Sequence, residues 1–374
     1  MTITRLTHFL KNSKHKFEPY TKVQYLSEFK GKRIAVDAHN WMFKHIAGAQ
    51  RQNVNNTDVT LLELDRAETL KYWIGLALNS VIKFMELGIT PVFVFDGSSP
   101  PEKNDTKLKR RERQQTISQK IDILQTEISQ TSAVFVADET VNELKKLLTQ
   151  QVKVDMAEQD FLRNVLSGIG VPVVQAKEDA EKLCSQLCID GKVSAVYSTD
   201  SDNWPFGCPL LIKEIKPRRW FHEFERYDCE IVTVMLSDIL RILDLRFPVF
   251  VDLCIMAGCD YNKNIHGLGI GKAYELLKTY GSIDDLPKEF DVQCLNHVTC
   301  RNIFKHGPSE DSMRTGTLNF PKELPDTIRE ILESVGCDGY IQNFVEIHKK
   351  LPPPNDRNTV IPPERRYPRI VIRN

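Results

Sequence analysis

The sequence predicts an α/β protein whose parallel, twisted sheet carries helices on both faces. Apolar, β-rich runs with the character of buried strands recur along the chain, and segments with apolar residues at helical spacing lie between them. This alternation is typical of parallel sheets, because parallel neighbours need a crossover connection. Several of these segments end in acidic residues, which places acids along one edge of the expected sheet.

Five apolar runs have the composition of buried strands. They are residues 32–37, 91–97, 169–174, 193–197 and 209–215. Asp37 ends the first run, Asp96 lies at the end of the second, and Asp200 and Asp202 follow the fourth. In an open α/β sheet the carboxyl ends of the strands form the edge where ligands bind. These acids are therefore expected to face one common site.

Helical spacing of apolar residues marks the segments between the strands. The expected helical segments include residues 6–10, 41–43, 61–85, 179–187, 250–260 and the end of 267–277. Gly88 ends the third of these, and residues 50–60 before it have the composition of a polar loop. Asp179 and Glu181 open the fourth, and Asp260 ends the fifth. Three more acids are thus expected near the same edge.

Composition indicates the domain organisation. Six basic residues within 103–113 begin a long polar helical stretch, so residues 97–155 are interpreted as an insertion between two strands. A basic run is usually a solvated helix face, but this one directly follows Asp96 and is expected to lie over the acids. The periodicity then weakens, so residues 291–374 are expected to form a partly irregular C-terminal extension of a main domain at 1–290.

Charge and cysteine usage exclude some classes of protein. The 374 residues include 50 Lys plus Arg and 50 Asp plus Glu, so the net charge gives no global sign of nucleic acid. The nine cysteines form no Cys-x-x-Cys pair, and Cys184 and Cys188 have the spacing of one helix face. With no signal peptide and no long apolar run, we expect a soluble intracellular protein with reduced thiols, no structural zinc and no membrane span.

Seven acids are expected to meet at the strand ends: Asp37, Asp96, Asp179, Glu181, Asp200, Asp202 and Asp260. One Asp-x-Asp alone is more often a surface feature, but seven acids exceed what general acid–base catalysis needs. Carboxylates repel unless cations lie among them, and their oxygens suit Mg²⁺. The set predicts two metal ions about 4 Å apart, as in displacement at phosphorus. His39 is a candidate base, although a packed or exposed histidine is the favoured interpretation.

A glycine-rich turn precedes the last expected helix. Backbone N–H groups at a helix start attract phosphate, so Gly267, Gly269, Gly271 and Lys272 are candidate binding residues. By itself the pattern fits a nucleotide site, a nucleic-acid backbone site or a plain turn equally well. Lys272 and Lys278 favour a polyphosphate backbone. We expect Gly269 to have a positive φ and to allow close backbone approach.

Taken in order, these motifs resemble the flap endonucleases, the XPG-type structure-specific 5′ nucleases. The resemblance covers residues 32–286, and its blocks occur in family order. It implies a PIN-like sheet, a helical arch at 97–155 and a helix–two-turn–helix element at 257–286 within the nuclease domain. Family members hold two Mg²⁺ ions with the seven acids, so two Mg²⁺, or Mn²⁺ in their place, are the expected cofactors. Asp179 stands where the family more often has glutamate.

The resemblance also implies roles for single residues. Lys103 and Arg110 match the basic pair that reaches from the arch to the scissile phosphate. Phe43 falls where the family has a tyrosine that stacks on a base near the cut. The glycine turn matches the element that grips duplex DNA and usually holds K⁺, so K⁺ is expected there. Ile270 replaces the usual proline.

The ends of the chain depart from the family pattern. The first six residues are Met-Thr-Ile-Thr-Arg-Leu, where the family has Met-Gly-Ile-x-Gly-Leu, so contacts made by a glycine terminus are not implied. No sliding-clamp motif is found, and clamp binding is unsupported. The expected partner is branched or flapped DNA and the expected state is a monomer. The expected location is the nucleus, or the host nucleus if the gene is viral.

The sequence thus predicts a metal-dependent nuclease that cuts branched DNA near a 5′ flap junction, in replication, repair or recombination. A 5′→3′ exonuclease or a junction or bubble nuclease is an alternative, because the family covers these with one active site. A DNA-binding scaffold without catalysis is a further alternative, which the presence of all seven acids disfavours. A ribonuclease of the related PIN fold is usually smaller and lacks the arch and the glycine-turn element.

Overall fold

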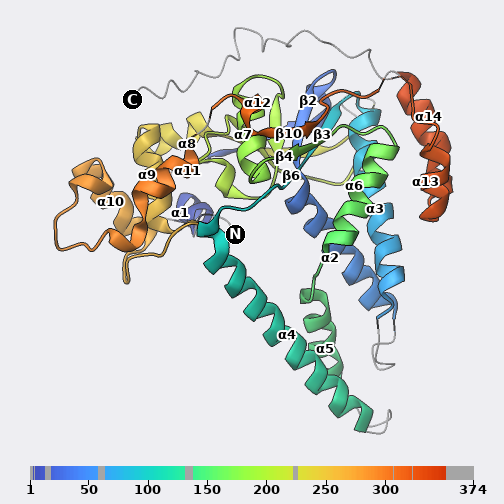
Figure 1. Ribbon diagram of the computed structural model, residues 1–374, viewed down its shortest axis with the longest axis horizontal. Coiled ribbons are helices and arrows are strands. Elements are labelled where there is room, and N and C mark those ends of the chain that lie inside the picture. The colour runs from blue at the N-terminus through green and yellow to red at the C-terminus, as the bar shows by residue number, and fades with distance from the viewer. Residues whose placement is uncertain are drawn as a thin grey trace.

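The computed structural model describes residues 3, 5–12, 18–57, 64–130, 138–221, 226–305, 307–321 and 323–350. Figure 1 shows a central sheet between two groups of helices, with a long helical projection that leaves the body of the molecule. The α/β class expected from the sequence is confirmed.

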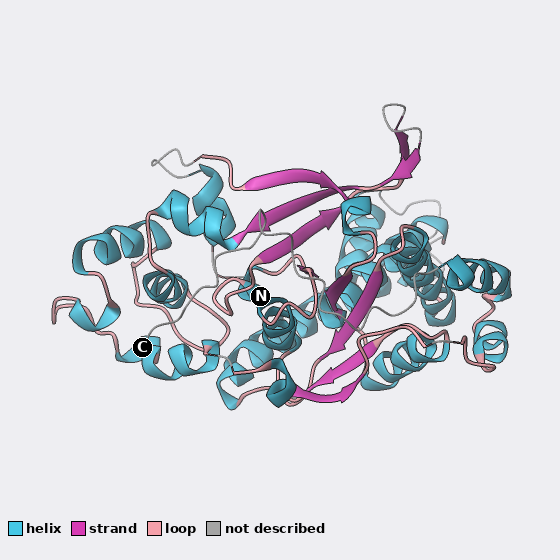
Figure 2. Ribbon diagram, turned by 90° about the horizontal axis from the view of Figure 1, so that it is seen from above, coloured by secondary structure: helices cyan, strands magenta, loops and turns pink. Residues whose placement is uncertain are grey.

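An eight-stranded sheet forms the centre of the fold. In sheet order the strands are β1 (Thr21–Tyr25), β9 (Glu230–Met235), β6 (Leu210–Ile215), β5 (Ala195–Tyr197), β2 (Arg33–Asp37), β3 (Thr90–Phe95), β4 (Val173–Ala176) and β10 (Met313–Gly316). The central strands from β6 to β4 are parallel, while β9, β1 and β10 extend the two edges in antiparallel pairing. A separate hairpin of β7 (Arg219–Phe221) and β8 (Arg226–Asp228) follows β6. Figure 2 shows the strands from above.

Helices cover both faces of the sheet, as the sequence predicts. One face packs against α1 (Leu6–Asn12), α7 (Ala180–Ile189), α8 (Leu236–Leu243), α9 (Phe247–Ala257), α10 (Ile270–Tyr280) and α11 (His297–Phe304). The other packs against α2 (Ala38–Asn56), α3 (Arg66–Glu86), α6 (Met156–Gly168), α13 (Ile328–Ser334) and α14 (Ile341–Lys350). Strand residues alternate between the two cores, since Ala35 joins the first and Ile34 and Val36 the second.

The insertion after β3 forms the helical projection. It consists of α4 (Asn104–Gln130) and α5 (Asp138–Gln150), which extend away from the sheet in Figure 1. A small core of its own joins the two helices to the far end of α2. Its buried members are Val54, Ile117, Ile121, Ile128, Leu144, Leu147 and Leu148. The projection is therefore attached through packing near its middle as well as at its base.

The prediction of a polar loop at residues 50–60 is wrong for its first part, because α2 continues to Asn56. Asn53, in this last part of α2, has a buried side chain. Asn53 Nδ2 donates to the carbonyl oxygen of Asp65 at 2.9 Å and to Thr69 Oγ1 at 2.8 Å. A polar composition misleads here because Asn53 is buried but hydrogen-bonded, while the other polar side chains of residues 51–56 are exposed on the helix. Residues 58–60 lie outside the described part of the chain.

Two further elements begin later than expected. The third predicted helix starts at Arg66, because the Asp65 carboxylate accepts from the N–H of Ala67 at 2.8 Å and caps it. The strand expected at 169–174 is observed as β4, from Val173. Gly170 has a φ of +80° in the turn that follows α6, and this turn occupies the start of the predicted strand.

The segment after residue 290 takes part in the main sheet. β10 pairs with β4, with Met313 opposite Ala176 and Gly316 opposite Val174. Leu332 of α13 is buried in the core beside α3 and α6. The short polar strand has no apolar alternation, so periodicity alone does not reveal it. Residues after 350, which include the expected irregular tail, lie outside the described residues.

Among the described residues, each helix is too short or too polar to cross a membrane.

Candidate active site

Acidic side chains from several strand ends meet at the carboxyl edge of the parallel strands. Asp37 ends β2 and caps α2, Asp96 follows β3, and Asp200 lies beyond the end of β5. Asp179 is the residue before α7, in the loop that follows β4. Neighbouring parallel strands end at one edge, and acids far apart in sequence therefore share one region of the structure.

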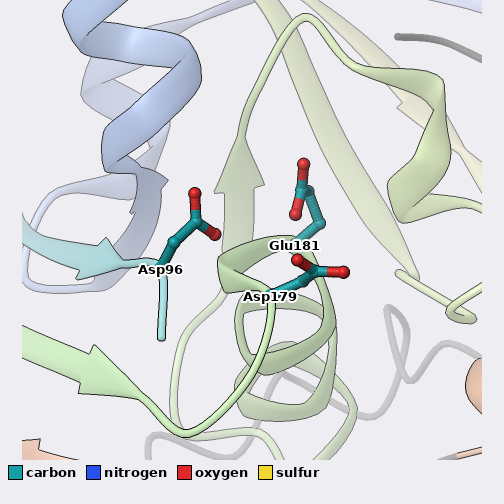
Figure 3. A group of neighbouring side chains, drawn as sticks. All are labelled: Asp96, Asp179 and Glu181. Carbon is teal, nitrogen blue, oxygen red and sulfur yellow. The ribbon is translucent and has the colours of Figure 1, made fainter. Parts of the chain in front are cut away.

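The most compact group of acids is Asp96, Asp179 and Glu181. One oxygen of each carboxylate lies within 4.8 Å of those of the other two. Figure 3 shows Asp96 at the end of its strand, across from the start of α7, where Asp179 precedes the helix and Glu181 lies in its first turn. Within the described part of the chain, these ligand atoms are close enough to surround one small cation.

Backbone contacts hold Asp96 against α7. The N–H of Gly97 donates to the carbonyl oxygen of Glu178 at 2.6 Å, and that of Ala180 donates to Asp96 Oδ1 at 2.7 Å. A Cβ atom at Gly97 would lie 2.3 Å from the carbonyl oxygen of Ala176. Any other residue at this position would force the two loops apart. The glycine after Asp96 is therefore needed to bring the acids together.

Ser198 links Asp37 to the acids after β5. Its hydroxyl donates to Asp37 Oδ2 at 2.9 Å and accepts from the N–H of Asp200 at 3.1 Å. Asp200 Oδ1 in turn accepts from the N–H of Asp202 at 3.1 Å. The three carboxyl groups are buried. The Ser198 hydroxyl thus links the end of β2 to the loop that follows β5.

Asp260 reaches the site from the end of α9. Gly258 has a φ of +103° and ends that helix, so the chain turns before the acid. Arg110 Nη2 donates to Asp260 Oδ2 at 2.9 Å, and Thr106 Oγ1 donates to the Asp260 carbonyl oxygen at 3.2 Å. The first turns of α4 are therefore bonded directly to the acidic edge.

Lys103 contributes a second cation from the base of the projection. Its Nζ lies 3.0 Å from Asp179 Oδ1, while the hydroxyl of Tyr261 donates to Asp179 Oδ2 at 2.8 Å. Burial alone would lower the pKa of Lys103, but Glu181, Asp179 and Asp96 outweigh burial and raise it. Lys103 is therefore charged and offsets part of the negative charge of the group.

The buried acids are held in an environment that favours their neutral form. Burial, followed by the charge of Asp96, raises the pKa of Asp37 to about 7. Burial also raises the pKa of Glu181 and of Asp202 well above the usual range, with further contributions from Asp37 and Asp200 respectively. A cation among these groups would reverse the effect and allow all of them to ionise.

The donor set fits hard divalent cations. All candidate ligands are carboxylate oxygens, the type that Mg²⁺, Ca²⁺ and Mn²⁺ prefer. Two buried oxygens, Glu181 Oε2 and Asp202 Oδ1, have no hydrogen-bond partner among the described residues. A buried oxygen left without a partner is costly, and a bound cation would satisfy it.

Phe43 and His39 lie one turn apart on α2 beside the acids. Nδ1 of His39 is 3.6 Å from Asp96 Oδ2, and its ring centroid is 4.7 Å from that of Phe43. Burial lowers the pKa of His39, although Asp96 opposes the shift. His39 thus packs on a neighbouring ring and lies beside Asp96.

The glycine turn lies at the start of α10, on the far side of α9 from the sheet (Figure 1). The expectation of a positive φ at Gly269 is wrong, because its φ is −85° and it is the extended residue that precedes the helix. The chain reverses at Gly267, whose φ is +74°. Gly271 lies in the first turn of α10, and Lys272 Nζ is 5.7 Å from the ring centroid of Phe290.

Sequence reasoning missed the residues that hold the acids in place. Tyr261, Ser198 and Thr106 each bond to an acidic residue of the site or to its backbone. Serine and threonine are common in loops, so no local pattern distinguishes these two. The one available signal for Tyr261 is that it directly follows Asp260.

The fold and the site define an α/β protein with a carboxylate centre suited to divalent cations and a basic helical projection above it. Family models for the XPG N-terminal domain and the XPG I-region match residues 1–117 and 170–260. Flap endonuclease 1 of Cryptosporidium muris (strain RN66) is 33% identical over 271 residues, which are 70% of this chain and 52% of that protein. Flap endonuclease 1-B of Physcomitrium patens is 30% identical over 265 residues, 71% of this chain and 69% of that protein.

The chain therefore belongs to the XPG and flap endonuclease family. It spans about half the length of the Cryptosporidium muris relative. Solved structures agree on the fold. Flap endonuclease-1 from Methanococcus jannaschii has a TM-score of 0.56 at 20% identity, over 88% of this chain and 96% of that chain. The catalytic core of Rad2 in complex with DNA substrate has a TM-score of 0.56 at 18% identity, over 92% and 99%.

Proposed function

We propose that the chain is a divalent-metal-dependent nuclease that cleaves phosphodiester bonds at 5′ flaps or other branched DNA junctions. The observation that carries this proposal is the group of Asp96, Asp179 and Glu181, with the Lys103 ammonium bonded to one member. Carboxylates brought this close together are costly to a fold unless they serve a cation. Relatives at 30–33% identity that are named flap endonuclease support the substrate class.

The acids would hold the metal ions and the basic pair would act on the phosphate. Bound divalent ions at such a site lower the pKa of the attacking water and stabilise the leaving oxygen. Asp96, Asp179 and Glu181 are grouped for one ion, and the remaining four acids would complete the set. Lys103 and Arg110 would exchange their carboxylate partners for phosphate oxygens, where negative charge builds up in the transition state.

Other residues would position the DNA. Phe43, beside the acids on α2, would stack on a base next to the cut. The glycine turn would hold a duplex strand through the N–H groups at the start of α10 and through Lys272. The position of α10 beyond α9 supports a contact with the duplex away from the cut. A K⁺ ion at this turn remains a prediction that rests on the family resemblance.

The preferred DNA structure separates the proposed function from its alternatives. Purified protein would be incubated in Mg²⁺ with end-labelled flap, nicked, gapped, bubble and four-way-junction DNA. We expect cutting within a few nucleotides of the 5′ flap junction, and no cutting in EDTA. A ladder of mononucleotide products from a nick or gap would favour the exonuclease, and preferred cutting of a bubble or junction would favour the other family activities.

A DNA-binding scaffold predicts binding without cleavage of any substrate. Binding of flapped DNA with no cleavage in either Mg²⁺ or Mn²⁺ would overturn the proposal in favour of the scaffold. Mg²⁺ as the natural ion, a monomeric state and a nuclear location all belong to this proposal, whereas binding to a sliding clamp is not part of it. The monomeric state is checked by light scattering with and without flap DNA.

A further inference from the structure

Asn40 joins two strand ends that carry acids of the site. It is the third residue of α2, and its backbone N–H donates to Asp37 Oδ1 at 3.1 Å. Its side-chain Oδ1 accepts from the N–H of Thr199 at 3.1 Å and from the Thr199 hydroxyl at 3.0 Å. One amide oxygen therefore ties the loop after β5 to the start of α2.

These bonds close a ring with the link already described at Ser198. Ser198 bonds to the second oxygen of Asp37 and to the backbone of Asp200, while Asn40 bonds to Asp37 and to Thr199. The ring spans β2 and β5, which are neighbours in the sheet. Both oxygens of the Asp37 carboxylate are thus held against the loop that leads to the other acids.

The acids in this ring need an external support. Asp37, Asp200 and Asp202 are at most 8% exposed, so water screens their mutual repulsion poorly. Strand β5 ends at Tyr197, before Asp200 and Asp202, and the β2–β5 pairing runs only from Ile34 opposite Ala195 to Val36 opposite Tyr197. Beyond that point the sheet does not fix the spacing of the loops. Among the described residues, the Asn40 and Ser198 bonds link Asp37 and the start of α2 to residues 198–200 across this gap.

We propose that Asn40 is a positioning residue that presets the distance between Asp37 and the loop carrying Asp200 and Asp202. This inference rests on the proposed function of the site as a metal centre. Asn40 acts through Thr199 and is not itself one of the acidic candidate ligands. Without the Asn40 side chain, the loop that carries Asp200 and Asp202 relaxes away from Asp37. A divalent ion must then restore the loop position when it binds, and this lowers the affinity of the site for the ion. Groups that orient metal ligands typically change metal affinity by about 10–100-fold.

The test compares matched variants of the full chain in the absence of DNA. Asn40→Ala removes both bonds, Thr199→Val removes the hydroxyl donor but keeps the N–H, and Thr199→Ser keeps both donors. Calorimetric titration with Mn²⁺ should show about tenfold or greater weakening for Asn40→Ala, a smaller loss for Thr199→Val and near wild-type affinity for Thr199→Ser. The double variant Asn40→Ala/Thr199→Val should match Asn40→Ala alone, because the hydroxyl then has no acceptor left to lose.

Asn79→Ala is the matched control. Asn79 lies on the neighbouring helix α3 and donates to the Tyr340 hydroxyl at 2.8 Å, so its loss removes a similar bond away from the acids. We expect its Mn²⁺ affinity to equal that of the wild type. Mn²⁺ affinity that falls as much in Asn79→Ala as in Asn40→Ala would reduce Asn40 to a general stabilising residue and overturn the inference.

Hydrogen exchange gives a readout that does not need metal. Thr199 is exposed, so the protection of its amide hydrogen depends on the bond to Asn40. In EDTA, Asn40→Ala should speed exchange at Thr199 and leave the buried strand amide of Val196 unchanged. Unchanged exchange at Thr199 would overturn the inference, even if Mn²⁺ affinity fell. A wild-type protein that binds no Mn²⁺ would contradict the proposed function, while the exchange result would still decide whether Asn40 holds the loop.

Discussion

The ammonium of Lys103 lies 3.0 Å from the carboxylate of Asp179, so the base of the helical projection is ion-paired with the acidic centre. This pair joins residues from two separate segments of the chain, and the side chain of Lys103 is only 13% exposed. The Lys103 ammonium, which would contact the phosphate during cleavage, is therefore ion-paired with Asp179 in the DNA-free structure. The contact connects the projection to the site before any DNA is bound.

Lys103→Ala should slow the cleavage step far more than it weakens DNA binding. Loss of one preorganised donor in a transition state costs about 10²–10³ in rate, and we expect a loss of this size in single-turnover cleavage of a 5′ flap. Lys109→Ala is the control, because Lys109 is an exposed residue of the same basic run. Equal losses of binding and rate in Lys103→Ala would show an ordinary backbone contact instead.

Asp96→Asn should abolish cleavage and leave DNA binding measurable. The substitution removes one charge from the compact carboxylate group, whereas phosphate contacts elsewhere supply most of the affinity. Asp160→Asn, on the exposed surface of α6, is the control and should cut normally. Cleavage and electrophoretic mobility shift are measured on the same flap DNA. Full activity of Asp96→Asn, or of the wild type in excess EDTA, would refute the metal-centre assignment.

The stability of the metal-free protein should fall as the pH rises from about 4 to about 7. Burial, followed by Asp96, raises the pKa of Asp37 from 3.8 to about 7. Between these values the folded protein binds more protons than the unfolded chain, so the free energy of unfolding decreases with pH. Asp37→Asn removes this contribution of the Asp37 carboxyl to the pH dependence of stability. In EDTA at about pH 8 it should melt at a higher temperature than the wild type, and the difference should vanish below about pH 4.

Thermal unfolding across a pH series measures this effect, with fluorescence as the readout. Added Mg²⁺ should stabilise the wild type above pH 7, since the ion favours the charged acids. The same addition should stabilise Asp37→Asn much less. Parallel pH curves for the two proteins in EDTA would contradict the raised pKa of Asp37.

The glycine turn gives a prediction about duplex binding. Lys272→Ala should weaken the binding of all duplex-containing substrates alike. It should also reduce the slope of log K against log salt concentration by about one unit. Lys278→Ala is the control, because its Nζ is already paired with Asp244 Oδ2 at 2.6 Å. Dissociation constants for flap DNA and for a single strand are measured against salt. If the salt slope for duplex binding is unchanged, or if single-strand binding weakens equally, the turn has a structural role and does not bind the duplex.

Two glycines of this turn should behave differently. Gly269 has a negative φ and a Cβ there meets nothing within 4 Å, so Gly269→Ala should fold normally and lose only duplex affinity. Gly267 has a φ of +74°, and Gly267→Ala should lower stability by about 1–2 kcal/mol. Melting temperature and duplex affinity measured on both variants separate the two effects. A stability loss in Gly269→Ala would contradict the backbone conformation described here.

Much of the fold follows from local pattern, and its edges do not. The parallel strands around Asp37 and Asp96 have apolar sequences long enough to be identified, because both of their faces are buried. β1 and β10 lie at the sheet edges and have polar residues, and no periodicity marks them. The helical end of α2 was missed because Asn53 is buried through hydrogen bonds rather than through apolar contact.

The sequence likewise predicts only part of the candidate site, namely the acids and not the residues that bond to them. Asp200 and Asp202 stand directly after a strand-like run, so their place at the sheet edge could be predicted. The partners of the acids could not, since Ser198 and Asn40 belong to residue types that are common in loops. The positive φ expected at Gly269 belongs to Gly267 instead, because the exact residue at which a turn reverses depends on the helix that follows.

By itself the sequence determined the α/β class, the family and the seven candidate acids. Each of these depends on residue types at short spacing, which the chain carries locally. Only the tertiary structure decided that Asp96, Asp179 and Glu181 form the compact group, that Lys103 and Arg110 are paired with acids, and that Asn40 ties two strand ends together. The physical reason is that distances between segments far apart in sequence are set by strand order and helix packing, which no local pattern records.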